Sequence, residues 1–425
     1  MRNLKLLLLT ALLLTTVGVF AQDDQENVTI IHSQDSRAMG AVLPIHVENF
    51  NDLQDAITVE WENISGVPDE QRNLYVTRFT AGSSTPDVLA VDIILVGDYA
   101  ARGWLEPLNQ YFDEGELEGF LGDFADAATV DGQLYAMPMY VDGIHLYYRT
   151  DLLEKYDFEP PETWEELIMQ ANTILEGEDD PNLTGFTSMW ADIEGLFMNW
   201  LGFFWGAGGQ FFDEEGNVAI NNEAGLTAMQ TMVDMLYEHE IASDSILTYR
   251  PDDARILFQQ GRAVFLMVQD FVWQPLTSED SPVADVVDFK RVPYFEGFED
   301  TNTTPLGGWL LAINANSDHK EEAAEWIGYV TSAEAQLTTA IEQGRLPTRV
   351  SVYDDPALDE NFPVAADQGA NYEVGNVRPS AQTGALYPQV SDIMQTEVTE
   401  ALFQRKSPEE ALADAEERIN EVLND

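Results

Sequence analysis

Strand-like and helix-like segments alternate in the first quarter of this chain, and few architectures accommodate that order. The sequence predicts strands at 28–32, 57–61 and 87–94, separated by helical stretches that run to about residue 56 and over 69–80. Strands separated by helices of about 10 to 15 residues form βαβ units. We therefore expect an α/β fold around a mainly parallel sheet, with more helix in the middle of the chain.

The N-terminal residues have the pattern of a secretory signal. Arg2 and Lys5 precede an apolar run, and small residues at Val19 and Ala21 precede Gln22, as at a signal cleavage site. We predict a signal peptide over 1–21 and an exported protein, periplasmic or extracellular. The chain contains no cysteine, which excludes disulfides, thiolate catalysis and Cys-ligated metal. A lipid anchor on an N-terminal cysteine is excluded for the same reason.

The charge balance excludes whole classes of partner. The chain of 425 residues has 76 Asp and Glu against 20 Lys and Arg, a net charge of −56. Phosphates would be repelled, so neither nucleic acid nor an anionic membrane surface is expected as the main partner. Salt screens such repulsion, so the surface is typical of a protein that works in high salt, as in a halophilic host.

Motifs that carry enzyme chemistry are missing from the sequence. It contains no nucleophile elbow, phosphate-binding loop or zinc-protease motif, and its five histidines have no ligand-like spacing. Adjacent acidic residues such as Glu214 and Glu215 are expected by chance at this acidic density. We expect neither a cofactor nor a metal.

Aromatic residues next to glycine or aspartate are the more informative signal. Trp309 follows Gly308, and Tyr140 lies two residues before Asp142, a spacing that puts both side chains on one face of an extended segment. A sugar has an apolar face that stacks on flat rings and a rim of hydroxyls that bind Asp or Arg. The sequence supplies both kinds of group.

Seven segments together carry a family resemblance. In their order and spacing, the chain resembles the extracellular solute-binding proteins of family 1, the sugar-binding receptors of ABC importers, and most of all their trehalose/maltose-type branch. The segments are TAGSSTPDV at 80–88, GWLEPL at 103–108, YYRTDLL at 147–153, PETWEEL at 161–167, GGW at 307–309, LPTR at 346–349 and RP at 378–379.

The resemblance implies a two-lobed periplasmic-binding-protein fold of type II, like that of maltose-binding protein, with hinge crossings and a cleft between the lobes. It places the crossings near residues 140, 307 and 348. The N-lobe would comprise residues 27–139 plus 310–347, and the C-lobe residues 140–309 plus 348–425.

The resemblance also implies a set of ligand-binding residues in the cleft. One departure from the branch is the loop over 32–40, which contains Asp35 but does not show the acidic residue expected at the mouth of the site. Trp190 is the loosest match. The implied set is Asp92, Tyr140, Asp142, Trp190, Trp273, Gly308, Trp309 and Arg378.

The sequence thus predicts a monomeric, non-enzymatic receptor that captures a di- or oligosaccharide by hinge closure and delivers it to a membrane permease. A trehalose/maltose-type disaccharide is the expected ligand. Three alternatives stay open. They are a secreted glycoside hydrolase, a receptor of the same family for glycerol-phosphate or another polyol, and a structural or adhesive surface protein.

Overall fold

The structure is a computed structural model that describes residues 27–66, 68–113, 115–301, 303–372 and 375–424. The predicted signal segment over 1–21 lies outside these residues. Within the described ranges, no helix has the length and apolar character needed to cross a bilayer.

One large mixed sheet organises the molecule, with strands in the spatial order β2, β1, β3, β10, β6, β8, β7. β1 pairs in parallel with β2 and β3, and β7 pairs in parallel with β8. β10 pairs antiparallel with β3 and β6, and β6 pairs antiparallel with β8, so the prediction of a mainly parallel sheet was wrong at its centre. The main strands are β1 (Val28–Asp35), β2 (Ile57–Ile64), β3 (Val88–Asp92), β6 (Ala136–Arg149), β7 (Thr184–Ser188), β8 (Ala263–Gln269), β9 (Val287–Lys290) and β10 (Pro305–Ile313).

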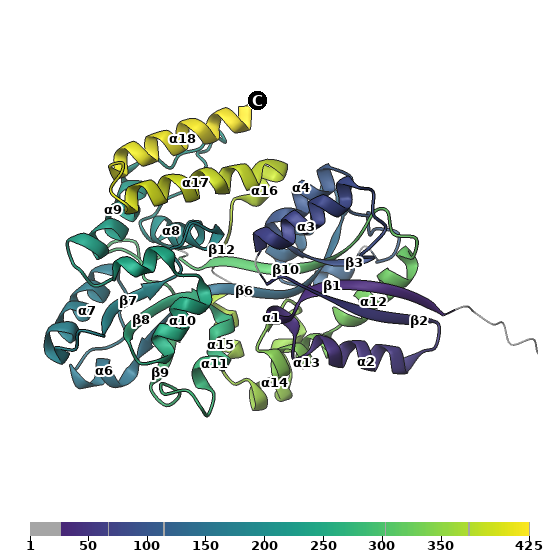
Figure 1. Ribbon diagram of the computed structural model, residues 1–425, viewed down its shortest axis with the longest axis horizontal. Helices are drawn as coiled ribbons and strands as arrows, with labels where there is room; N and C mark the ends of the chain where they lie inside the picture. The colour runs from purple at the N-terminus through teal and green to yellow at the C-terminus, as the bar shows by residue number, and fades with distance from the viewer. Residues whose placement is uncertain (1–26, 67, 114, 302, 373–374, 425) are drawn as a thin grey trace, which may run out of the picture.

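β6 and β10 connect the two sides of the molecule (Figure 1). The C-terminal end of β10 pairs with β3 on the N-side of the sheet, which comprises β1, β2 and β3. The second half of β6 pairs with β8 and β9 on the C-side, which comprises β7, β8 and β9. Twelve of the thirteen residues before Arg149 in β6 are buried, the exception being Asp142, as expected of a strand that is covered on both faces.

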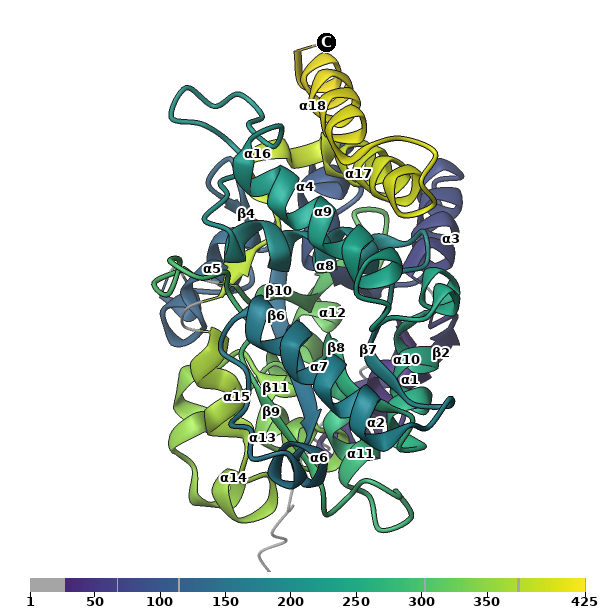
Figure 2. The same ribbon diagram turned by 90° about the vertical axis from the view of Figure 1, so that its left-hand side faces the viewer.

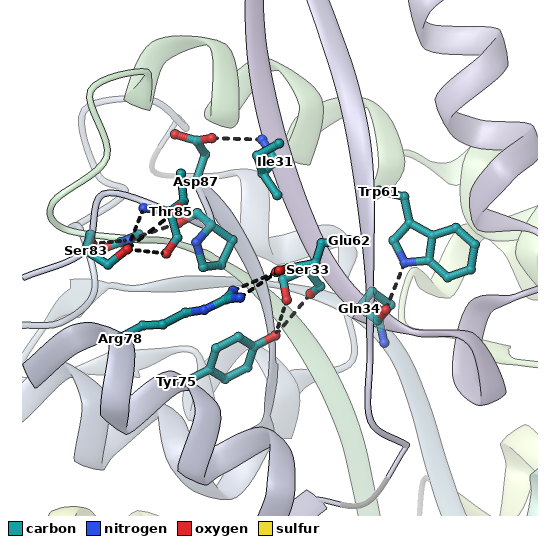
Figure 3. A network of polar contacts seen from close by, with 12 residues as sticks. Ile31, Ser33, Gln34, Trp61, Glu62, Tyr75, Arg78, Ser83, Thr85 and Asp87 are labelled. Atoms are coloured by element: carbon teal, nitrogen blue, oxygen red, sulfur yellow. Dashed lines mark hydrogen bonds and ion pairs between the residues drawn. The ribbon is translucent and has the colours of Figure 1, made fainter. Parts of the chain in front are cut away.

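Helices cover the N-side strands, and polar contacts hold them in place. The guanidinium of Arg78 in α3 binds both carboxylate oxygens of Glu62 at 2.6 and 2.7 Å. The hydroxyl of Tyr75 donates to the carbonyl oxygen of Ser33 at 3.1 Å (Figure 3). These contacts fix α3 against β1 and β2. The N-side helices are α1 (Ser36–Met39), α2 (Leu43–Leu53), α3 (Pro68–Thr80), α4 (Val96–Ala101) and α5 (Gly122–Ala127).

The C-side is more helical, as the sequence predicts. α17 and α18 lie side by side over α8 and α9 (Figures 1 and 2). α8 is buried along almost its whole length, because it lies between these helices and β10. The C-side helices are α6 (Thr150–Lys155), α7 (Trp164–Glu178), α8 (Glu194–Gly206), α9 (Glu223–Tyr237), α10 (Pro251–Gln259), α11 (Trp273–Thr277), α17 (Tyr387–Leu402) and α18 (Pro408–Asn424).

The segment after β10 returns to the N-side before the chain ends on the C-side. The short strand β11 pairs with Tyr140 and Val141 of β6. The helices η5 (Val350–Asp354) and α14 then pack against α13. The elements of this segment are α12 (Lys320–Val330), α13 (Ala333–Gln343), β11 (Leu346–Pro347), α14 (Pro356–Asn361), α15 (Ala365–Tyr372), β12 (Asn376–Val377) and α16 (Ser380–Thr383).

Candidate ligand-binding cavity

A cavity of about 430 Å³ lies between the N-side and the C-side of the sheet. β3 and β10 border it on one side, and the start of α8, the start of α10 and the end of β8 border it on the other. Six of the eight residues implied by the family resemblance line it. They are Asp92, Tyr140, Asp142, Gly308, Trp309 and Arg378.

Sheet register brings three of these residues together. Trp309 of β10 is the cross-strand neighbour of Asp92 in β3 and of Tyr140 in β6. Neighbours on one face of paired strands have Cβ atoms only about 5 Å apart. A residue at the end of β3, one from the middle of β6 and one from β10 therefore form a single row. The indole of Trp309 is half-buried, so part of the ring remains available to a ligand.

Gly308 permits a close approach beside this row. Its φ is +154°, and a Cβ built on it would lie 2.4 Å from Cε1 of Phe124 and 2.7 Å from the carbonyl oxygen of Tyr140. Only glycine fits at that spacing. Close packing by the ring of Phe124 and the backbone of Tyr140 therefore requires glycine at this position.

Arg378 connects carboxylates from the two sides of the cavity. Its Nη2 binds Oδ1 of Asp92 at 2.9 Å, and its Nη1 binds Oε1 of Glu194, the first residue of α8, at 3.0 Å. Burial acts to lower the pKa of Arg378, but Asp92, Tyr387 and Glu194 outweigh it and raise the pKa, so the guanidinium stays charged. Glu194 also accepts hydrogen bonds from the hydroxyls of Tyr387 and Ser391.

Asp142 brings a second carboxylate to the cavity from β6. Burial raises the pKa of Asp142, and the guanidinium of Arg345 acts in the opposite direction. Asp92 raises this pKa further, and Arg378 lowers it. Asp142 thus stays protonated to a higher pH than an ordinary aspartate.

A third carboxylate, that of Asp270, is buried behind the cavity. It follows β8 directly, is 1% exposed, and accepts a hydrogen bond from the hydroxyl of Tyr372. The ring of Tyr372 packs so closely on β6 that a Cβ built on Gly143 would lie 2.3 Å from its Cε1. Burial, and then the charge of Asp142, raise the pKa of Asp270 to about 8.

We expect Asp270 to make the stability of the protein depend on pH. Its pKa in the folded protein, about 8, lies above the ordinary 3.8. Protonated Asp270 contributes its full stabilisation below about pH 3.8. This contribution decreases as the pH rises from about 3.8 to about 8, because the unfolded chain loses the proton there and the folded protein keeps it. It is lost above about pH 8. The test measures unfolding temperatures of the wild type and of Asp270→Asn at pH 5 and pH 8.5. Between these pH values the unfolding temperature of the wild type should fall relative to that of the variant. An equal difference at both pH values would contradict the assignment.

Two residues of the implied set do not line this cavity. Trp190 is 1% exposed, its Nε1 donates to Oδ1 of Asn199 at 3.4 Å, and its ring packs against Phe186. Trp273 is half-buried, with its ring stacked on that of Tyr147. The structure therefore places both indoles in the packing of the C-side.

Several lining residues were not singled out from the sequence. Arg345 lies just before β11, with its guanidinium over the rings of Tyr140 and Phe271 at 5.0 and 5.6 Å. Arg37 reaches the cavity from α1, and Glu194 reaches it from α8. Apolar wall is supplied by Met189, Ile193, Met198, Pro68 and Pro251. Nothing in the local sequence of these residues marks them, because they meet only through the fold.

The arrangement can hold a small polar molecule. Aromatic faces from Trp309, Tyr140 and Phe271 and charged groups from both sides converge on one enclosed volume. A volume of this size is typical of small-molecule sites. Groups of three or more His, Asp or Glu placed to bind a metal are not found within the described part of the chain.

Known proteins share this fold and sequence. The family model described as bacterial extracellular solute-binding protein matches residues 35–337. A probable ABC transporter-binding protein from Deinococcus radiodurans is 30% identical over 377 residues, which cover 86% of each chain. An arabinooligosaccharide-binding protein from Halalkalibacterium halodurans is 22% identical, covering 83% of this chain and 80% of its own.

A solved structure gives the same result. Maltose-bound MalE3 of T. maritima is 35% identical, covers 92% of this chain and 98% of its own, and superposes with a TM-score of 0.85. The GacH receptor of Streptomyces glaucescens, at 23% identity and a TM-score of 0.82 over 94% of this chain and 99% of its own, shares the fold. The expected type II periplasmic-binding-protein fold is thereby confirmed. The chain belongs to the family of bacterial extracellular solute-binding proteins.

Proposed function

We propose that this protein is the extracytoplasmic carbohydrate receptor of an ABC importer and that it holds a di- or oligosaccharide in the cavity between its two sides. The observation that carries the proposal is the row of Asp92, Trp309 and Tyr140, which sets a half-exposed indole between a carboxylate and a second ring. Such a row fits a pyranose, with its apolar face on the indole and its hydroxyls on the acceptors.

Closure of two lobes around the ligand follows from the position of β6 and β10. We infer the lobe division given above, 27–139 plus 310–347 and 140–309 plus 348–425, with the crossings in β6, β10 and after β11. Bending at these crossings would open the cavity, and a ligand that contacts both sides would favour the closed form. The protein would act as an exported monomer and transfer its ligand to a permease.

Calorimetric titration with neutral di- and oligosaccharides tests the receptor role. We expect at least one of these sugars to bind and to be recovered intact after prolonged incubation. Maltose and trehalose are the first to examine. Release of monosaccharide would instead support a glycoside hydrolase. Absence of any heat or thermal shift across sugars and polyols, at low and high salt, would contradict the receptor role.

Asp142→Asn should weaken sugar binding by about 5- to 20-fold, because a charged acceptor forms a stronger hydrogen bond than a neutral one. The raised pKa of Asp142 adds a pH effect. Wild-type affinity should fall as the pH is lowered and Asp142 becomes protonated, whereas the affinity of the variant should change less. Titrations at several pH values measure both.

Asp359→Asn is a suitable control, since it makes the same charge change on an exposed residue of α14. Its affinity should equal that of the wild type. If Asp142→Asn binds as tightly as this control at neutral pH, Asp142 is not a ligand acceptor.

A further inference from the structure

A second, smaller chamber adjoins the cavity. It has a volume of about 210 Å³ and shares four wall residues with the main cavity. We call it the outer chamber. The shared residues are Arg37, Asp252, Phe271 and Arg345. A ligand that fills the main cavity could therefore extend a substituent past these residues without a change of fold.

The outer chamber is positively charged in a strongly acidic protein. Arg37, Arg255 and Arg345 line it together with one carboxylate, that of Asp252. Asp252 is already paired, because its Oδ1 binds Nε of Arg255 at 2.9 Å. Two guanidiniums thus remain without a counter-charge from the chamber wall, although the chain as a whole carries −56.

Arg345 is held rigidly in this wall. It is 6% exposed, its Nε donates to the carbonyl oxygen of Ala38 at 3.1 Å, and its guanidinium lies over the ring of Tyr140 and over that of Phe271. Among the described residues no hydrogen bond is recorded for its two Nη atoms. A guanidinium fixed in this way binds a planar oxyanion with little further loss of side-chain entropy.

Arg37, a residue of α1, provides the second cation. It is exposed on α1, which begins directly after β1, in the segment 32–40 where the sequence departs from the trehalose/maltose type. No ion pair is recorded for it within the described ranges. Arg37 and Arg345 lie in the walls of both chambers, so an anion at the boundary would have access to both.

We propose that the outer chamber binds a carboxylate of an acidic carbohydrate through Arg37 and Arg345. This inference rests on the proposed receptor function and narrows its substrate class. A monoanion fits better than a phosphate ester, because Asp142 of the adjoining cavity already shares the fields of Arg345 and Arg37 and would repel a second negative charge. A guanidinium also matches the two oxygens of a carboxylate.

The test is a calorimetric comparison of matched acidic and neutral sugars on the mature chain. One pair is maltobionate and maltitol, and the other is α-1,4-linked digalacturonate and digalactose. In at least one pair we expect the acidic member to bind about tenfold more tightly, as a charge-assisted hydrogen bond adds about 1.4 kcal/mol or more. Arg37→Gln should reduce the preference to about twofold or less.

Arg405→Gln controls for the change in net charge, because Arg405 is exposed in the turn after α17 and pairs only with Glu400 among recorded ion pairs of the described chain. It should keep the full preference. Arg345→Gln should lose it as well, and its far-ultraviolet circular dichroism reports whether that buried substitution still folds.

Each other outcome contradicts a defined part of the proposal. Neutral sugars that bind as tightly as their acidic partners would overturn the inference and leave the receptor function standing. Tighter binding of maltose 1-phosphate than of maltobionate would overturn the choice of a carboxylate. If the preference for acidic sugars survives in both Arg37→Gln and Arg345→Gln, the carboxylate does not bind in the outer chamber. No binding of any neutral or acidic sugar would overturn the receptor function too.

Discussion

Arg378→Met should lower the free energy of unfolding by about 3 to 5 kcal/mol at neutral pH, because it leaves two carboxylates without their shared cation. Arg378 is 2% exposed, and it binds Asp92 and Glu194 from opposite sides of the cavity. Methionine fills much of the same volume, so the loss reports charge rather than an empty space. Denaturant unfolding of the ligand-free protein measures it.

Two further variants separate charge from packing. Adding Glu194→Gln to Arg378→Met should restore part of the lost stability, because one uncompensated carboxylate is then removed. Arg405→Met removes an exposed ion pair and should cost no more than about 1 kcal/mol. If Arg378→Met is no more destabilising than Arg405→Met, the bridge across the cavity does not stabilise the fold.

Trp309→Ala should reduce sugar affinity by about 30- to 150-fold, or about 2 to 3 kcal/mol, because it removes the ring on which the sugar stacks. Among the nine tryptophans, Trp309 alone lines the cavity within the described residues. We therefore expect the variant to lose the ligand-induced change in tryptophan fluorescence as well. Titration by calorimetry and by fluorescence gives independent measurements of these two effects.

Trp104→Ala serves as the matched control for this prediction. Trp104 is half-buried like Trp309, but its ring packs on Phe79 and Tyr99 rather than into the cavity. The control should keep both its affinity and its fluorescence response. Unchanged affinity in a folded Trp309→Ala variant would remove Trp309 from the site.

The N-side strands could be predicted from the sequence, and the family resemblance implied the three residues that form the row in the cavity wall. The observed β1, β2 and β3 overlap the predicted strands, because apolar β-formers alternate there with clear helical stretches. The capping box at Thr163 and Glu166, a local signal, is present at the start of α7. Asp92 lies at a strand end, where open α/β sheets present ligand-binding groups.

Side-chain direction could not be predicted in the same way. The family resemblance implies Trp273, whereas Phe271, two residues earlier, lines the cavity. The chain turns helically from η4 (Asp270–Val272) into α11, and residues two apart on a helix point to nearly opposite faces. The side chains of Met189 and Trp190 also point in different directions, because consecutive side chains of an extended stretch alternate between its two faces. Met189 lines the cavity and Trp190 is buried away from it.

Long-range contacts account for the other features that the sequence did not predict, the antiparallel centre of the sheet and the arginines of the outer chamber. The sequence suggested a mainly parallel sheet because its βαβ units are local, whereas β10 joins β3 and β6 in antiparallel pairs that link distant segments. Arg37 and Arg345 are likewise far apart in the chain and share a wall only in the folded protein. Such contacts leave no periodicity in the local sequence.

The pairing of β3 with β10 also sets an order of events during synthesis. β3 ends at Asp92, and its partner begins only at Pro305, so most of the chain must be translated before the first strands gain their missing neighbour. Non-local pairing of this kind makes folding slow. The N-side of the sheet therefore keeps an unpaired edge at β3 until at least residue 313 has been synthesised.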